Sequence, residues 1–399
     1  MSWPKKPLGE VADFQLGKML DQVKNRGDSR PYLANKNVRW GSFDLSELRE
    51  MLFEEAEFER FSLKNGDIVM CEGGEPGRCA IWREQLPKMM YQKALHRIRP
   101  YDGMDSVFLY YNLSHRAQSG HFNGLFTGAT IKHLPREKLA LVEVDAPDLP
   151  TQQRIAGILS AYDDLIENNR RRIGLLEQAA RLLYREWFVR FRFPGHETAK
   201  FVDGLPEGWS RGIIADLFDT SSGGTPSRKN DGFYDGSINW LKTQELQNCF
   251  IYETDEKITE EGLKRSSAKL FPESTVVVAM YGATIGQLAI LANPSSTNQA
   301  CCALLPKREP EDYLFAYCLM EHSAKILKDL GQGAAQNNVS QQVIRSMDIL
   351  IPSYSVLDMF NAVIFENFQQ RRNLQAQNTK LTRARDLLLP RLMDGRIPV

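Results

Sequence analysis

Residues 150–188 read PTQQRIAGILSAYDDLIENNRRRIGLLEQAARLLYREWF, and the spacing of the apolar side chains in this stretch decides the architecture. From Ile155 to Trp187 an apolar residue recurs at intervals of alternately four and three, and only Asn169 interrupts the series. Such spacing is typical of a helix that packs an apolar seam against another helix as a coiled coil. At about 1.5 Å per residue, the stretch predicts a helix roughly 55 Å long. The seam consists of Ile155, Leu159, Tyr162, Ile166, Asn169, Ile173, Leu176 and Leu183.

A second stretch near the end of the sequence repeats this spacing with a more polar middle. Its apolar seam residues are Leu357, Phe360, Ile364, Leu374, Leu381 and Leu388. Two seams of equal length in one chain favour pairing of the two helices with each other, although docking of each helix on its own domain would give the same pattern. We expect Pro390 to end the second helix, because proline lacks the N–H that a helix interior needs.

The chain outside these helices is a tandem repeat with a shift of about 200–208 residues. Residues 66–70 and 79–82, two short apolar runs around a glycine-rich turn, are answered by 275–279 and 287–290. A long helical pattern follows each copy. A repeat of this length indicates a duplicated domain plus helix rather than a solenoid unit.

The repeat unit reads as a β-rich mixed domain, because short β-branched runs alternate with Gly, Pro, Asn and Asp. The fold class is therefore α/β (α+β), with two β-rich domains that are each followed by a long helix. We place the boundaries at 1–148 (domain 1), 149–196 (first helical segment), 197–352 (domain 2) and 353–399 (second helical segment).

The composition is that of an ordinary globular protein, with 42% apolar and 25% charged residues. No apolar run reaches the length of about 18 residues that spans a bilayer, so we expect no membrane segment and a cytoplasmic location. The 50 basic and 50 acidic residues balance. This balance argues against a protein that coats nucleic acid through bulk positive charge.

Catalytic and metal-binding motifs are absent from the sequence. There is no G-x-x-x-x-G-K-[ST], no H-E-x-x-H and no G-x-S-x-G. Residues 293–296, NPSS, fall short of the Asn/Asp-Pro-Pro-aromatic tetrapeptide of DNA methyltransferases, and residues 255–257, DEK, read as an acidic loop rather than a nuclease site. The six cysteines include no C-x-x-C pair and the six histidines lack metal-ligand spacing. Together these absences favour a binding protein without a catalytic or metal site.

Polar loops at matched places in the two domains carry side chains suited to nucleic acid. In domain 2, residues 223–229 read GGTPSRK and residues 238–244 read INWLKTQ; in domain 1, residues 35–40 read NKNVRW. Hydroxyl, Arg and Lys groups suit phosphate contacts, and Asn, Gln, Arg and Lys suit base edges in the major groove. Each loop alone could be a solvated turn, and their recurrence is what favours a function.

Five segments give the chain a family resemblance when they are combined with the duplicated domain–helix layout. They are PTQQRIA at 150–156, NNRRR at 168–172, GGTPS at 223–227, TNQ at 297–299 and LLLPRLMDG at 387–395. Over essentially its full length, the chain resembles the DNA-specificity subunit of a type I restriction–modification enzyme.

The resemblance implies that each domain is a target recognition domain for one half of a split site in double-stranded DNA. The two helices would pair antiparallel as a spacer and would dock two adenine methyltransferase subunits, and translocase–nuclease subunits would join for cleavage. This chain would bind no cofactor, because S-adenosylmethionine would belong to the methyltransferase and ATP with magnesium to the nuclease subunits. A spacer of about 55 Å corresponds to roughly 16 base pairs, so we expect an unread gap in the target. Because the two domains differ in sequence, we also expect the target to be asymmetric.

The second copy of the PTQQR segment is degraded to SVLDM at 355–359, so the two docking surfaces need not be equal. The residues that we expect to contact DNA are polar or aromatic loop residues: Tyr32, Arg39, Arg78, Lys93, Thr127, Arg228, Lys229, Tyr234, Lys242, Gln244, Tyr281, Gln336 and Asn337. Two other interpretations stay open: a scaffold whose helices and domains bind proteins, and a self-contained methyltransferase or nuclease.

Overall fold

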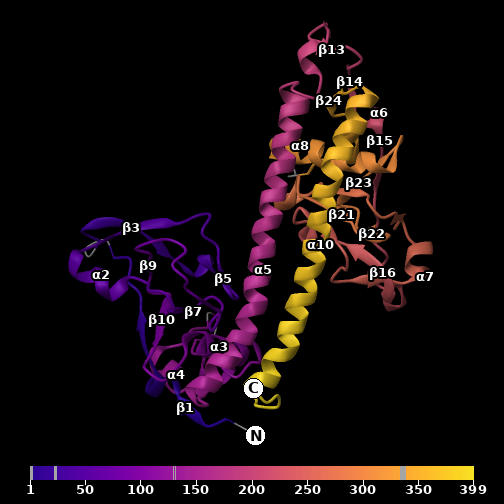
Figure 1. Ribbon diagram of the computed structural model, residues 1–399. Coiled ribbons are helices and arrows are strands. Elements are labelled where there is room, and N and C mark those ends of the chain that lie inside the picture. Colours follow the sequence, from indigo (N-terminus) through magenta and orange to yellow (C-terminus); the bar gives the residue numbers. More distant parts are fainter. Residues whose placement is uncertain (1–2, 22–24, 129, 131, 333–337) are drawn as a thin grey trace. The chain divides into compact units, whose positions relative to one another are not determined.

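Figure 1 shows the computed structural model, which describes residues 3–21, 25–128, 130, 132–332 and 338–399. The chain divides into two compact units. Unit 1 comprises Met1–Leu165 with Lys380–Val399, and unit 2 comprises Ile166–Thr379. Each unit therefore contains one β-rich domain and parts of both long helices.

A four-stranded sheet with the order β2-β10-β7-β8 forms the centre of domain 1. Its strand β7 (Ile68–Cys71) is buried on both faces. Ile68 and Met70 pack with helix α3 (Ser106–Gln118), whereas Val69 and Cys71 pack against a second sheet. This alternation follows from the two-residue period of a strand. The other strands are β2 (Ala12–Leu16), β10 (Leu95–Pro100) and β8 (Cys79–Ile81).

The second sheet of domain 1 has the order β6-β3-β9, and its strands are β3 (Asp28–Leu33), β6 (Arg49–Phe53) and β9 (Met90–Tyr91). Two strand pairs lie beside these sheets: β1 (Lys5–Pro7) with β11 (Glu143–Asp145), and β4 (Val38–Arg39) with β5 (Ser42–Phe43). The short helices are α1 (Leu8–Val11), α2 (Glu55–Phe61) and α4 (Arg136–Ala140).

Domain 2 repeats this plan around strand β20 (Val276–Ala279). Val276 and Val278 pack with helix α8 (Tyr313–Gln332), and Val277 and Ala279 face the opposite core. The main sheet, in the order β15-β23-β20-β21-β17, consists of β15 (Phe218–Ser222), β23 (Cys301–Pro306), β20, β21 (Leu288–Leu291) and β17 (Cys249–Ile251). The second sheet, in the order β18-β16-β22-β19, consists of β18 (Lys257–Ile258), β16 (Tyr234–Leu241), β22 (Ser295–Thr297) and β19 (Leu270–Phe271).

The remaining elements of domain 2 lie outside these two sheets. They are β12 (Phe201–Val202), β13 (Leu205–Pro206), β14 (Ser210–Ile213), β24 (Asp348–Ile351), α6 (Ile214–Leu217), α7 (Glu260–Lys264) and α9 (Gln341–Arg345). Strands β12, β13 and β19 lack an equivalent strand among the described residues of domain 1, where the isolated bridge of Ser62 with Met90 stands at the place of β19. Strands β3 and β16 each pair antiparallel with one neighbour and parallel with another. The tandem repeat expected from the sequence is confirmed.

The two long helices are α5 (Leu149–Tyr184), which a π-helical turn (Arg185–Val189) continues, and α10 (Tyr354–Met393). Within unit 2, the Asn169 amide donates to the side-chain oxygen of Asn378 at 3.0 Å, and the Asn367 amide donates to the carbonyl of Leu176 at 2.9 Å. The residue numbers of the partners on α10 therefore decrease as those of the partners on α5 increase. The helices pair antiparallel, as the resemblance implies.

Every predicted seam residue is buried or half-buried. The buried members are Ile155, Leu159, Ile166, Asn169, Leu357, Phe360, Ile364 and Leu374, and the half-buried members are Tyr162, Ile173, Leu176, Leu183, Leu381 and Leu388. Ile155 and Leu159 also enter the core of domain 1, and Leu357, Phe360 and Ile364 enter that of domain 2. Helix pairing and domain docking thus share one apolar stripe. The expectation that Pro390 ends the second helix is wrong, because α10 continues to Met393.

Candidate nucleic-acid interface

A pair of glycines holds the loop of residues 223–229 against the backbone of domain 2. A Cβ atom on Gly223 would lie 2.1 Å from the carbonyl oxygen of Thr297, and one on Gly224 would lie 2.3 Å from the backbone of Ser267. Only glycine permits so close an approach. The Gly224 N–H donates to the Thr297 carbonyl at 2.9 Å. The next residue of the loop, a threonine, donates to the side chain of Gln299, so the GGTPS and TNQ segments meet in space.

Two basic residues of domain 2 share one carboxylate. Arg228 and Lys242 donate to the two oxygens of Glu256 at 2.6 and 2.8 Å. The Arg228 guanidinium also lies 4.3 Å from the centre of the Tyr234 ring and 5.2 Å from that of Trp240. Ring faces attract cations, so these contacts orient the guanidinium at the surface.

This group keeps a positive charge that is available to a ligand. Hydrogen bonds from Arg228 and then from Lys242 hold the pKa of Glu256 below its usual value, so the carboxylate is ionised at neutral pH. Glu245 and Asp255 also act on the charge of Lys242, whereas Glu256 is the carboxylate that acts on Arg228. The side chain of Arg228 is 55% exposed and can reach a phosphate, whereas that of Lys242 is mostly covered.

The other candidates of domain 2 differ in their accessibility. Lys229, Gln244 and Tyr281 are exposed, and Tyr281 stands at the loop between β20 and β21. Tyr234 is half-buried, and its hydroxyl donates to the carbonyl of Pro226 at 2.6 Å. The remaining two, Gln336 and Asn337, lie outside the described residues.

In domain 1 the two candidate arginines are paired with carboxylates. Arg39 is exposed and lies 3.3 Å from Asp44. Arg78 is largely covered; it donates to Glu75 at 2.5 Å and to the carbonyl of Asn35 at 3.0 Å. Arg78 therefore supports the loop between β7 and β8, and Arg39 has the more accessible guanidinium.

Lys93 and Thr127 are exposed, as a DNA contact requires, but Tyr32 is not. Tyr32 is only 4% exposed and packs in the core between the two sheets of domain 1. Its parallel pairing with Met90 matches that of Trp240 with Ser296 in domain 2, and Trp240 is equally buried. Tyr32 is therefore not accessible to DNA in this structure, because this position of the strand faces the core in both domains.

The sequence interpretation missed the domain 1 counterpart of the glycine loop. Gly17 follows β2, and a Cβ atom there would lie 2.3 Å from the carbonyl oxygen of Tyr91. The next N–H, of Lys18, donates to that same carbonyl at 3.1 Å, as Gly224 does in domain 2. Lys18 in place of a second glycine hides the match, and its buried ammonium group donates to Glu57.

A polar cluster fixes domain 1 on the helices within unit 1. The Tyr111 hydroxyl of α3 donates to Asp163 of α5 at 2.6 Å, and the same carboxylate accepts a hydrogen bond from Arg385 of α10. We call these three residues polar cluster 1. Gln152, from the PTQQR segment, adds to the attachment, because its side chain accepts from the Asp105 N–H at 2.8 Å.

Polar cluster 2 does the same within unit 2 and consists of Tyr317, Arg371 and Glu177. Arg371 of α10 is 1% exposed and donates to the Tyr317 hydroxyl of α8 at 3.2 Å and to Glu177 of α5 at 3.1 Å. It also lies 3.3 Å from the carbonyl of Asn248 in domain 2. The buried guanidinium thus contacts the domain and both helices.

In the part of the chain that the structure describes, no group of three or more His, Cys, Asp or Glu side chains could hold a metal ion. Among the described helices, none has both the length and the apolar character required to cross a membrane.

The sequence matches the family described as the type I restriction modification DNA specificity domain over residues 2–178 and 206–382. The specificity subunit of the type I restriction enzyme MjaIX from Methanocaldococcus jannaschii is 26% identical over 407 residues, which cover 99% of this chain and 92% of that protein. The HindI specificity subunit from Haemophilus influenzae is 27% identical over 330 residues, 67% of this chain and 72% of that protein. The fold is similar to that of the S subunit of a type I restriction–modification system from M. genitalium, with a TM-score of 0.62, 16% identity and coverage of 98% and 96%.

Proposed function

Because this chain belongs to the type I restriction–modification DNA-specificity family, we propose that it directs a multi-subunit enzyme to a bipartite, asymmetric sequence in double-stranded DNA. It is a specificity subunit, a role without catalysis of its own. Each β-rich domain reads one half of the target, and the paired helices α5 and α10 connect the two readers.

The observation that carries this proposal is that the two domains share a backbone fold but differ in the side chains of their exposed loops. The four strands of the main sheet of domain 1 have the same order as the first four of domain 2, to which β17 is added, and both domains attach to α5 and α10 through a tyrosine and an ion pair. The exposed loops differ: the glycine loop of domain 2 presents Arg228, whereas its counterpart after Gly17 presents exposed Met19 and Leu20. Readers with different side chains on one frame bind different half-sites, which makes the target asymmetric.

The long helices also support a proposal about partners. On α5 the side chains of Leu165, Leu175 and Leu182 are exposed, and on α10 those of Val363 and Leu387 are exposed. Exposed apolar side chains on helices favour protein docking. We assign these surfaces to two adenine methyltransferase subunits that use S-adenosylmethionine, with translocase–nuclease subunits that use ATP and magnesium joining the complex.

The balanced charge of the chain is consistent with a complex in which partner subunits contact part of the DNA. A protein that neutralises many phosphates needs more Lys and Arg than Asp and Glu, and in this chain the two totals are equal. The isolated chain therefore binds DNA weakly, and the partner subunits supply much of the phosphate contact. Tight binding by the isolated chain that is insensitive to salt would contradict this part of the proposal.

The test is methylation of a random-sequence DNA library by the purified complex. The cognate methyltransferase subunit is incubated with S-adenosylmethionine in the presence and in the absence of this chain. We expect N6-methyladenine at one defined motif only when the chain is present. Equal methylation without it would remove the specificity role.

A further inference from the structure

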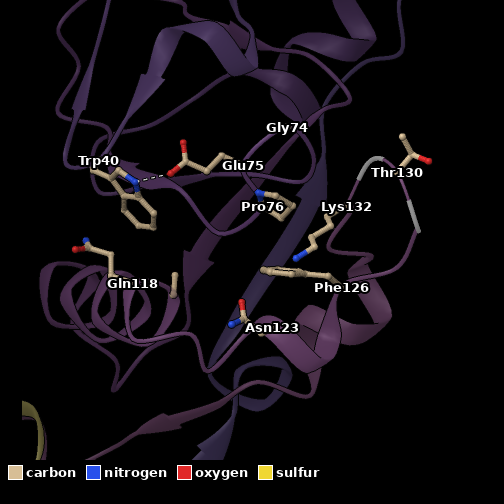
Figure 2. Close-up of a pocket in the computed structure, with 10 residues that line it drawn as sticks. Trp40, Gly74, Glu75, Pro76, Gln118, Asn123, Phe126, Thr130 and Lys132 are labelled. Atoms are coloured by element: carbon tan, nitrogen blue, oxygen red, sulfur yellow. Dashed lines mark hydrogen bonds between the residues drawn. The ribbon is translucent and has the colours of Figure 1, made fainter. Parts of the chain in front are cut away.

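A groove of about 970 Å³ opens on domain 1 and lies outside the residues expected from the sequence. Figure 2 shows Trp40 and Gln118 at one side of the groove and Phe126 and Lys132 at the other. The lining comes from the turn after β4, the loop between β7 and β8, the end of α3 and the segment that follows α3. Four separate parts of the domain thus converge on one opening.

One wall of the groove is held in place before any ligand arrives. The Trp40 indole N–H donates to one oxygen of Glu75 at 2.8 Å, and Arg78 donates to the other at 2.5 Å. Arg78 is anchored in turn to the carbonyl of Asn35. A carboxylate accepts at about four positions, so Glu75 keeps acceptor capacity toward a ligand.

The rest of the groove lining offers unused polar groups. The Asn123 side chain is exposed and makes no hydrogen bond to any described residue. Gln118 donates through its amide nitrogen to Ser114 at 3.0 Å, which leaves its amide oxygen as an acceptor. Lys132 is exposed, with its ammonium group 5.9 Å from the centre of the Phe126 ring. Amides, a cation and an aromatic ring therefore face one space.

The backbone that frames the groove is repeated in domain 2. In domain 1 the Leu134 N–H donates to the Glu72 carbonyl at 2.7 Å, and in domain 2 the Val339 N–H donates to the Met280 carbonyl at 2.8 Å. The neighbouring bridges correspond as well, Gly73 with His133 and Tyr281 with Asn338. The loop after the central strand is thus held in the same way in both domains.

The side chains of the loop after the central strand differ between the two domains. The loop after β7 reads GGEP at residues 73–76, whereas the loop after β20 reads YGAT at residues 281–284. The two loops have the same backbone arrangement but different side chains. We therefore expect such loops to distinguish the two half-sites.

We propose that this groove is the base-reading site of domain 1, an inference that rests on the proposed function. Gln118 and Asn123 contact base edges of one half-site in the major groove, and Lys132 contacts a backbone phosphate. Trp40 and Phe126 provide the apolar sides of the groove.

The chemistry of the lining determines what each residue recognises. Primary amides such as those of Gln118 and Asn123 match the paired donor and acceptor of adenine, and a carboxylate such as Glu75 accepts from the amino group of cytosine. An ammonium group on a phosphate adds affinity without sequence preference. Specificity therefore resides in the amides, and Lys132 sets how tightly all sites are bound.

The first test is to map methylated sites for the complex that contains Gln118→Ala/Asn123→Ala. We expect at least one position in one half of the motif to accept additional bases, while the other half and the gap stay unchanged. Lys132→Ala should lower methylation at every site and leave the motif intact. Gln85→Ala, an exposed amide of domain 1 outside the groove, is the matched control. An unchanged motif with the double variant overturns the inference and leaves the specificity role standing.

A second measurement covers the case in which the double variant abolishes methylation altogether. The complex that contains Asn123→Cys is incubated with target duplexes that carry a disulfide-tethered thiol on a base of either half. We expect cross-linking to one half only. No cross-link to either half, with methylation of the unmodified target retained, overturns the base-reading assignment.

Discussion

Polar clusters 1 and 2 attach the two domains to the same pair of helices with opposite charges. In cluster 1 the residue that accepts from the domain tyrosine is an aspartate of α5, and in cluster 2 the residue that donates to the tyrosine is an arginine of α10. In both clusters the acidic residue lies on α5 and the basic residue on α10. This distribution favours pairing of α5 with α10 over pairing of α5 with the α5 of a second chain, which would bring like charges together.

The two clusters differ in their access to water. The side chain of Arg385 in cluster 1 is 26% exposed, whereas that of Arg371 in cluster 2 is 1% exposed. Two nitrogens of Arg371, Nε and Nη1, have no hydrogen-bond partner among the residues that the structure describes. A buried ion pair is costly to break because the remaining partner keeps a desolvated charge, whereas an exposed pair contributes little. The attachment through a tyrosine and an ion pair therefore contributes more to the stability of unit 2 than to that of unit 1.

The largest expected effect is the loss of Arg371. Arg371→Met should lower the free energy of unfolding of unit 2 by about 3 kcal/mol, the lower end of the range for a broken buried pair, because Glu177 retains some contact with water. Arg385→Met should cost less than about 1 kcal/mol in unit 1. Denaturant-dependent hydrogen exchange resolved by peptide measures both units in one sample. Equal losses would contradict the comparison.

The control for this prediction removes both charges of the pair. Arg371→Met combined with Glu177→Met should recover most of the stability that is lost in the single variant, because no buried charge is then left unpaired.

The next effect concerns the polar seam pair of unit 2. Asn169→Leu alone should cost about 1–2 kcal/mol, because the side-chain oxygen of the half-buried Asn378 loses its donor. Asn169→Leu with Asn378→Leu should restore the stability but weaken the control of register. Chemical denaturation gives the first quantity, and sedimentation detects any self-association of the double variant. A single variant as stable as the original would show that the amide pair contributes nothing.

The seam and the central strands could be predicted from the sequence, and the contacts between distant residues could not. The four–three spacing places Ile155 and Leu159 correctly because helix geometry depends only on local order. Arg371 reads as a hydrated interruption of the seam, yet it is buried because Glu177, 194 positions earlier, lies beside it. Burial of Tyr32 follows from packing between sheets, which a loop-based interpretation does not contain.

The groove of domain 1 was not predictable for the same reason. Trp40, Gln118 and Lys132 are far apart in sequence and carry no common motif, so only the fold places them together. Candidates on loops between strands, such as Arg228, could be placed at the surface from the sequence, because such loops are exposed in most folds.

A smaller difference between the domains is their response to pH. His96 of β10 is fully buried, its Nε2 bonds the carbonyl of Leu134, and burial lowers its pKa. The unfolded chain therefore binds a proton below about pH 6.5 that the folded chain refuses, so stability falls as the pH drops below that value. The equivalent residue of domain 2, Cys302, does not titrate there, since burial raises its pKa to about 12.

The slope that His96 contributes is at most about 1.4 kcal/mol per pH unit. We expect hydrogen exchange from β10, corrected for intrinsic rates, to show this loss of stability between pH 6.5 and 5, and His96→Gln to reduce it. His115, whose pKa burial also lowers, is present in both proteins, so the difference between them isolates His96. An identical pH dependence in the variant would rule out this role.

The smallest expected effect is at the carboxylate that Arg228 and Lys242 share. Glu256→Gln releases two cations toward DNA and should raise non-specific affinity severalfold at low salt, with a plot of log affinity against log salt steeper by roughly 1. Fluorescence anisotropy of a labelled random duplex measures both quantities for the assembled complex. Glu260→Gln, an exposed acid of the same domain, is the control and should change neither slope nor affinity as much.

The most direct test of the whole interpretation is modified-base sequencing of a methylation-free host that expresses this chain with its cognate methyltransferase subunit. Two unlike readers on one helix pair predict N6-methyladenine in a motif of two different halves with a fixed unread gap, absent when the chain is omitted. A single uninterrupted motif, two identical halves, or methylation that persists without the chain would contradict it.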